Sequence, residues 1–155
     1  MTERARTGRQ RRDDTIAKFE AVGADAWVAT ASGAGMAHLV PISYAWDGEC
    51  VVLAAEASSL TIRNVRSSRR ARLGFGPTRD VVIVDAELDR LLDARDGAAE
   101  DTARAYAEQA GWDPRDESEP YVFVLLRPLR VQAWREANEL AGKVLMRDGS
   151  WLFQV

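Results

Sequence analysis

Short apolar segments separated by tight-turn sequences are the feature that most constrains the fold of this chain. Three such segments follow one another at Ala26–Ala31, Ala37–Trp46 and Glu49–Ala55. Ser-Gly-Ala-Gly at 32–35 separates the first pair, and Asp47-Gly48 separates the second. An Asp-Gly pair between apolar runs is a strong signal for a type I′ hairpin turn. The sequence therefore predicts three successive antiparallel strands.

The rest of the chain adds further strands and sets helices between them. The additional predicted strands are Arg70–Gly76, Asp80–Leu92, and Tyr121–Leu126 continuing after Arg127-Pro128 as Leu129–Trp134. The predicted helices are Asp13–Val22, a helix capped by Ser58 or Ser59 that runs to about Ser68, and Ala98–Ala110, with a helical turn near Glu136–Leu140. A doubly wound sheet would alternate strand and helix regularly. About six antiparallel strands with interspersed helices instead predict a closed or split β-barrel with flanking helices.

The length and the N-terminal segment bound the organisation of the chain. Its 155 residues are enough for one domain with its own core. Met1–Arg12 carries five arginines but no apolar segment, so it is not a secretory signal. We predict a flexible Arg-rich arm over 1–12, with a lid or an anion-binding arm as its functional alternative. We predict a single domain over 13–155. We also predict that the protein is cytoplasmic.

The chain has only short apolar runs, one cysteine and one histidine, which excludes membrane-spanning, disulfide-rich and zinc-cluster proteins. The longest apolar runs, Val81–Val84 and Tyr121–Leu126, fall short of the roughly 20 residues that cross a membrane, so no membrane partner is predicted. Cys50 and His38 are single representatives of their types. They leave no disulfide framework and no Cys/His zinc cluster, so no metal site is predicted. No catalytic residue is assigned, and a cofactor that carries the chemistry itself would agree with this scarcity.

Charge is unevenly distributed along the chain. With 21 basic and 24 acidic residues the formal net charge is −3, so no nucleic-acid partner is predicted. Thr61–Arg79 nevertheless contains six arginines and no acid, whereas Asp85–Glu119 contains twelve acids. A basic segment inside an acidic protein favours a small anionic ligand. The alternative is a solvated helix face in a chain whose basic residues are almost all arginine.

The segment from Ser58 to Asn64 contains the strongest binding pattern. A helix beginning near Ser59 would present unpaired N–H groups and a partial positive charge, which bind phosphate. Ser58, Ser59 and Thr61 add hydroxyls, and Arg63 adds a planar guanidinium that matches phosphate oxygens. The glycines of a nucleoside-triphosphatase loop are absent from this segment. The alternative interpretation is a capped helix with an exposed arginine.

The predicted strand His38–Trp46 has two unlike faces. One face is bulky and suits a barrel interior: His38, Val40, Ile42, Tyr44 and Trp46. The other is mostly small and would let a flat ring approach the backbone: Ala37, Leu39, Pro41, Ser43 and Ala45. Because Pro41 has no N–H, it is not expected in the middle of a fully paired ladder. The alternative is a lightly covered sheet face beneath a helix.

The order of these features resembles the pyridoxamine 5′-phosphate oxidase-like split β-barrels, and within them the flavin/deazaflavin oxidoreductase group. The resembling segments are Ala26–Thr30, His38–Ser43, Ser59–Asn64, Arg70–Leu73, Thr78–Val82 and Val131–Arg135. The resemblance implies a mainly β fold with flanking helices, a six-stranded antiparallel split β-barrel of FMN-binding type. It also implies a homodimer with two cofactor sites at the subunit interface.

The resemblance implies roles for particular residues as well. Pro41, Ile42 and Ser43 would lie against a flavin or deazaflavin ring. The phosphate would be held by five residues around the helix start: Ser58, Ser59, Thr61, Arg63 and Asn64. Arg79 would approach from the following strand. Trp134 would come from the partner subunit or its edge, with a core or interface tryptophan as the alternative.

The function implied by the resemblance is that of an oxidoreductase using the deazaflavin coenzyme F-420. FMN-binding members place an Arg-Lys pair in the phosphate loop, where this chain has Ser58-Ser59-Leu60-Thr61. The implied reaction is hydride transfer from the reduced cofactor to a conjugated small-molecule acceptor, with a proton from solvent, Tyr44 or Ser43. The alternatives are an FMN-dependent enzyme of pyridoxamine-phosphate oxidase type and a non-catalytic dimer that binds flavin, deazaflavin or haem.

Overall fold

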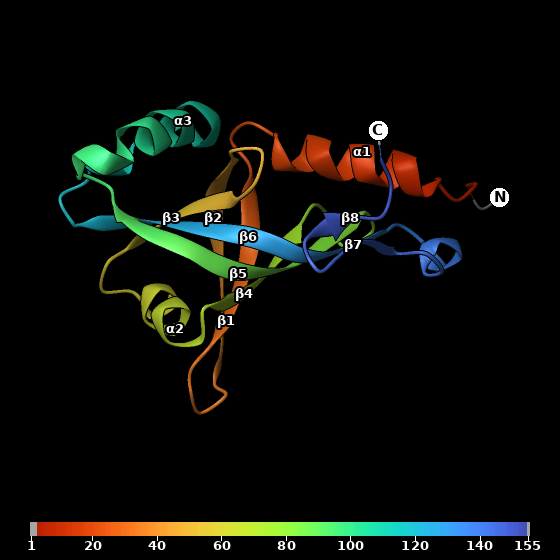
Figure 1. The fold of residues 1–155 in the computed structure, drawn as a ribbon, viewed down its shortest axis with the longest axis horizontal. Coiled ribbons are helices and arrows are strands. Elements are labelled where there is room, and N and C mark those ends of the chain that lie inside the picture. Colours follow the sequence, from red (N-terminus) through yellow and green to blue (C-terminus); the bar gives the residue numbers. More distant parts are fainter. Residues whose placement is uncertain (1–2, 155) are drawn as a thin grey trace.

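The computed structural model describes residues 3–154 as an antiparallel β-barrel with α-helices packed on it (Figure 1). The strands are β1 (Asp25–Ala31), β2 (Ala37–Trp46), β3 (Val51–Glu56), β4 (Arg70–Phe75), β5 (Val81–Asp93), β6 (Tyr121–Trp134), β7 (Val144–Arg147) and β8 (Ser150–Trp151). The α-helices are α1 (Gly8–Phe19), α2 (Leu60–Ser68) and α3 (Glu100–Ala110). Short 3-10 turns are η1 (Gly97–Ala99), η2 (Pro114–Asp116) and η3 (Ala137–Glu139). Among residues 3–154, no helix combines the length and the apolarity needed to cross a membrane.

Six strands close the barrel in the order β3-β2-β1-β4-β5-β6, and β6 returns to pair with β3. All of these neighbours are antiparallel. The short strands β7 and β8 extend the sheet from β6. The predicted six-stranded antiparallel split barrel with flanking helices is therefore confirmed. The three strands predicted from turn sequences are β1, β2 and β3, and β2 has its predicted bounds.

Strand β6 runs through Pro128 without a break. Its register with β5 shifts between Asp85, which faces Arg130, and Ala86, which faces Pro128. Leu129 is thus an extra residue, and the shift is a β-bulge. A bulge tolerates proline because the missing N–H falls where the ladder is already interrupted. The two strands predicted on either side of Arg127-Pro128 are consequently one strand of 14 residues.

The bulky face of β2 packs inside the barrel from Ile42 to Trp46, as predicted, whereas His38 and Val40 are half-buried outside the barrel core. Tyr44 is buried in the barrel against Phe75, with ring centroids 4.9 Å apart in an edge-to-face arrangement. Ile42 and Trp46 pack against the same core. Burial of such side chains provides the main stabilisation of the barrel, at roughly 25 cal/mol for each Å² of apolar surface removed from water.

A second apolar layer lies outside the barrel, where α3 covers β2, β3 and β6 (Figure 1). Tyr106 of α3 is fully buried, and its hydroxyl donates to the carbonyl of Ser43 at 2.9 Å. Ala45, on the small face of β2, packs in this layer. The interpretation of that face as covered by a helix is therefore correct for its C-terminal part, whereas Leu39 and Pro41 remain exposed.

Helix α2 covers another part of the barrel, on the side opposite α1 and α3 in Figure 1. Ile62 and Val65 on its inner face join the barrel core. Ser59 is its N-cap, and the Ser59 Oγ accepts a hydrogen bond from Ile62 N at 3.3 Å. Asn64 is also buried, and its Nδ2 donates to Thr30 Oγ1 at 3.1 Å. This bond ties α2 to β1.

The N-terminal segment differs from the flexible arm predicted over 1–12. Helix α1 begins at Gly8 rather than near Asp13 because Thr7 and Gln10 form a capping box. Gly8 packs so closely on the Phe153 ring that a Cβ at position 8 would collide with it. Arg11 is 6% exposed and donates from Nη1 to the Glu139 carbonyl at 2.9 Å. Described residues of the predicted arm are therefore part of the packed structure, and residues 1–2 lie outside the described range.

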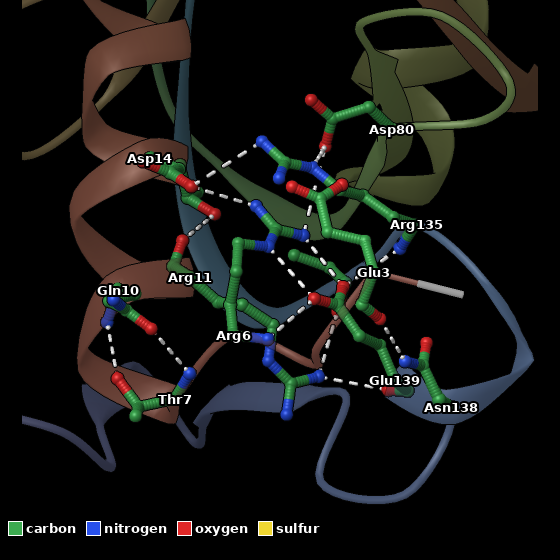
Figure 2. A network of polar contacts seen from close by, with 12 residues as sticks. Glu3, Arg6, Thr7, Gln10, Arg11, Asp14, Asp80, Arg135, Asn138 and Glu139 are labelled. Carbon is green, nitrogen blue, oxygen red and sulfur yellow. Dashed lines mark hydrogen bonds and ion pairs between the residues drawn. The ribbon is translucent and has the colours of Figure 1, made fainter. Parts of the chain in front are cut away.

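Arg6 and Glu139 form the centre of a polar network that joins the N-terminus to η3 (Figure 2). Glu139 is 2% exposed and accepts from Arg6 N, Nε and Nη2 at 2.8–2.9 Å. Its carboxylate also accepts from Arg135 N at 2.9 Å. Arg6 in turn donates from Nη1 to Asp14 at 2.9 Å. The hydrogen bonds and positive charge of Arg6 lower the pKa of Glu139 to about 2.

We predict that Arg6→Ala destabilises the protein by about 3 kcal/mol, because removing one partner leaves a buried carboxylate unpaired. Arg104→Ala is the matched control, since Arg104 forms only exposed ion pairs on α3 and its loss should cost less than about 1 kcal/mol. Urea unfolding of the two variants measures both effects. Equal stabilities would contradict a structural role for the N-terminal network.

A second prediction concerns pH. The pKa of Glu139 is depressed in the folded state, so its contribution is complete above the unfolded pKa of about 4.3 and is lost as the pH falls toward 2. The wild type should therefore lose more free energy of unfolding between pH 5 and pH 2 than Glu139→Gln does. Denaturant unfolding across this pH range tests the difference. If the free energy of unfolding of the two proteins depends on pH in the same way, Glu139 does not contribute the predicted stabilisation.

Candidate functional site

The barrel opens where β2 and β3 diverge. Strand β2 pairs with β1 from Ala37 to Ser43, but with β3 only from Tyr44 to Trp46. The backbone edge of β2 over 38–43 therefore faces no partner strand on its β3 side. Pro41 lies on this edge, so the prediction that it is not in a fully paired ladder is confirmed.

A cavity of about 550 Å³ lies along this free edge. Its walls come from β2, the end of β3, the start of α2, and the aromatic residues around the loop that follows α3. The lining residues are His38, Val40, Pro41, Ile42, Ser43, Ala54, Ala55, Glu56, Ser59, Leu60, Thr61, Trp112 and Tyr121. Residues of both faces of β2 take part, so the cavity follows the edge of the strand rather than its small face alone.

The first turn of α2 gives one end of the cavity its polarity. The Ser59 carbonyl accepts the first intrahelical bond, from Arg63 N at 3.1 Å. Ile62 N is capped by the Ser59 hydroxyl. Leu60 N and Thr61 N have no hydrogen-bond acceptor among residues 3–154. Two free donors at a helix N-terminus form an anion-binding position, although the exposed carboxylate of Glu56 stands beside it.

Five of the ten predicted site residues come together in this cavity. They are Pro41, Ile42, Ser43, Ser59 and Thr61. Ser43 contributes through its backbone and position, because its hydroxyl donates to Asp25 Oδ1 at 2.8 Å. Ser58 and Arg63 are exposed next to the cavity but do not line it.

The other three predicted residues lie elsewhere in this chain. Asn64 faces inward and is bonded to Thr30, because it shares the buried face of α2 with Val65. Arg79 sits in the turn between β4 and β5, at the ends of these strands that lie away from α2, and pairs with Glu136 at 2.8 Å. Trp134 is at the same end of the barrel, opposite Val81 in the β5–β6 ladder. A single chain thus leaves Arg79 and Trp134 outside the cavity.

Two aromatic residues of the cavity were absent from the sequence-based set. Trp112 and Tyr121 meet edge to face, with ring centroids 5.3 Å apart. The sequence gives only a weak indication of their role. Trp112 directly follows Gly111, which ends α3, and lies in a segment predicted only as a loop. Together Trp112 and Tyr121 add an aromatic surface to the cavity lining.

Tyr44 is removed from the candidates for proton transfer. Its hydroxyl donates to the Lys18 carbonyl at 2.6 Å, within the barrel rather than at the cavity. Burial raises the pKa of Tyr44 to about 12. Its role in this structure is to join β2 to the end of α1.

Comparison with known proteins identifies the architecture. No protein-family profile and no curated protein sequence matches the chain. Among solved structures, an F-420 reductase superimposes with a TM-score of 0.58 at 16% identity, covering 74% of this chain and 93% of that one. A conserved hypothetical protein of Mycobacterium tuberculosis gives 0.64 at 20% identity, covering 88% and 92%.

A pyridoxamine 5′-phosphate oxidase-related, FMN-binding protein of Nostoc punctiforme gives a TM-score of 0.53 at 10% identity, covering 81% of this chain and 79% of that one. Sequence identities this low establish shared architecture only. The chain therefore has the split-barrel fold of the pyridoxamine 5′-phosphate oxidase-like proteins.

Proposed function

We propose that the chain is an oxidoreductase that binds the deazaflavin coenzyme F-420 in the cavity beside β2. One observation carries this proposal: an apolar strand edge and a helix N-terminus with two free N–H groups meet in one cavity. This combination suits a molecule that has a flat ring at one end and a phosphate at the other.

The residues of the cavity fit a tricyclic ring. A volume of about 550 Å³ lies within the range of cofactor sites. Pro41 and Ile42 offer a surface without side-chain donors, and Trp112 supplies an aromatic wall. The unpaired backbone edge of β2 over 38–43 provides donors and acceptors for the polar rim of such a ring.

The phosphate would bind at the start of α2. Leu60 N and Thr61 N are free to donate, and the Ser59 cap holds the helix start in place. Arg63 and Ser58 are exposed beside the cavity and would reach the phosphate from its outer side. The guanidinium of Arg63 would also offset the negative charge of Glu56 at this position.

The chemistry would come from the cofactor, which supplies hydride transfer to a conjugated small-molecule acceptor. The chain binds and orients both molecules. Of the proton sources considered, Tyr44 is buried in the barrel and the Ser43 hydroxyl is held by Asp25. We therefore assign the proton to solvent. The likeness to an F-420 reductase and the absence of an Arg-Lys pair in the phosphate segment favour F-420 over FMN.

We further propose that the active form is a homodimer. Trp27 and Leu39 are 54% and 60% exposed on the outer face of the β1–β2 hairpin, next to Pro41. Trp27 stands opposite Pro41 in the ladder, and Ile83 continues the same row across Gly74. A second copy covering this face would border the cavity. It would also account for Arg79 and Trp134, which the single chain leaves away from it.

We predict that Arg63→Ala weakens F-420 binding by about 1–3 kcal/mol, the loss expected for a charged hydrogen bond. Arg66→Ala is the matched control, because Arg66 is exposed on the last turn of the same helix. Absorbance titrations with F-420 and FMN, followed by turnover assays with quinones and enones, test cofactor and activity together. FMN binding without F-420 binding would favour the FMN enzyme, and tight binding without turnover would favour a non-catalytic carrier.

We predict that Trp27→Glu and Leu39→Glu convert the dimer to a monomer, because a charge in an apolar interface is desolvated without a partner. Val22→Glu is the control, since Val22 is 77% exposed in the turn that Gly23 ties to α3. Light scattering after size-exclusion chromatography measures the mass. A monomeric wild type would contradict the proposal.

A further inference from the structure

A second cavity lies at the opposite end of α2 and shares no residue with the first. Its volume is about 730 Å³, and its lining comes from the end of α2, from β1, β2 and β4, from the middle of β5 and β6, and from the β7–β8 turn. Four arginines on three strands line it: Arg70 and Arg72 of β4, Arg130 of β6 and Arg147 of β7. We call it the arginine groove.

The sheet register explains how these arginines converge. Arg72 of β4 lies opposite Asp85 of β5, and Asp85 lies opposite Arg130 of β6. Residues facing each other on neighbouring antiparallel strands are only about 5 Å apart. The three charges therefore form one row across the sheet. Arg70 is two residues before Arg72 and points to the same face.

Most of this positive charge is uncompensated within the chain. Arg70, Arg130 and Arg147 form no ion pair with a carboxylate of residues 3–154, although Glu87 stands opposite Arg70 in the ladder. Arg72 donates from Nε to Asp85. The acids of the lining are Asp85 and Asp148, so the groove has two more arginines than acids in a protein with a net charge of −3.

Several other arginines of the chain are paired with acids. Arg6, Arg79, Arg115 and Arg127 each hold a carboxylate within 3 Å. The arginine groove instead brings together, in one cavity, three guanidinium groups that have no carboxylate partner among residues 3–154.

The groove is held in a fixed shape. Asp148 and Gly149 both have positive φ values, 52° and 77°, and form the tight turn that presents Arg147. Gly149 N donates to the Leu129 carbonyl at 2.9 Å, which fastens this turn to β6. On the opposite wall, Ser68 Oγ accepts from Arg70 N at 3.1 Å. The backbone that carries Arg70 and Arg147 is thus held in place before a ligand binds.

The floor between the arginines is apolar. Small side chains of β1 and β2 form it, namely Ala29, Ala31 and Ala37, whereas the side chains of Ala71 and Ala86 belong to the barrel core. A ligand that fits both floor and rim carries negative oxygens on a compact organic framework. The guanidinium fork binds phosphate and carboxylate oxygens in pairs.

We propose that the arginine groove binds a small organic oxyanion with at least two negative charges, such as a phosphorylated compound or a polycarboxylate. This site is separate from the proposed cofactor cavity and does not depend on it. The acidic balance of the whole protein opposes binding of a long polyanion. The arginines of the basic segment 61–79 therefore lie near both ends of α2. Arg63 lies near its start, and Arg70 and Arg72 lie beyond its end.

Calorimetric titration of the full chain at low ionic strength tests the proposal, with pyrophosphate and citrate as probes. Either probe is expected to bind one equivalent per chain, and the tighter one assigns the ligand to phosphoryl compounds or to polycarboxylates. Arg70→Ala and Arg147→Ala should each weaken binding by about tenfold, the effect of a lost charged hydrogen bond. Arg104→Ala on α3 is the matched control and should bind as the wild type does. All three substituted side chains are exposed, and circular dichroism serves as the check that the variants are folded.

Four results would overturn the proposal. The first is an absence of binding by both probes. The second is equal binding by the wild type and the Arg70→Ala, Arg147→Ala double variant. The third is that these variants change the mass in solution instead of the affinity, since the groove borders the proposed dimer face. The fourth is that Arg147→Ala weakens F-420 or FMN binding, which would make the groove part of the cofactor site. Failure of cofactor binding alone would leave the anion site standing.

Discussion

The ladder between β3 and β6 is the interaction on which the rest of the architecture depends. It runs from Val51 opposite Leu126 to Glu56 opposite Tyr121 and closes the barrel. Strand β3 keeps this ladder over its whole length but lies beside β2 for only three residues. The edge of β2 before Tyr44 is therefore left without a partner strand on that side, and the cavity lies along this edge.

Local signals in the sequence were sufficient for the strands but not for their long-range partners. Turn sequences located β1, β2 and β3, and the missing N–H of Pro41 placed it on an open edge. The N-terminal segment was misjudged because its arginines resembled a solvated tail. Their partner, Glu139, lies 133 residues from Arg6 and gives no local signal. A capping box at Thr7 was the one indication that the helix starts early.

For the candidate site, the helical periodicity of residues 60–66 predicts which side chains are exposed better than the residue types of the Ser58–Asn64 segment do. Asn64 and Arg63 are adjacent in sequence, yet positions 61, 62, 64 and 65 form the buried stripe of α2, and 60, 63 and 66 the exposed one. That pattern separates the buried amide of Asn64 from the exposed guanidinium of Arg63. Trp112 and Tyr121 needed the tertiary structure, because only the packing of α3 on the barrel brings the loop after that helix toward β2.

The burial of Arg6 and Arg11 has a practical consequence for any shortened version of this protein. A chain trimmed to start at the first strand, or even at residue 13, would retain the Glu139 carboxylate without its cation. It would also strip the carbonyls of Ala133, Glu139 and Ala141 of the guanidinium that now binds them. Because Arg6 and Arg11 bind groups at the far end of the chain, an expression tag belongs upstream of an intact N-terminal segment.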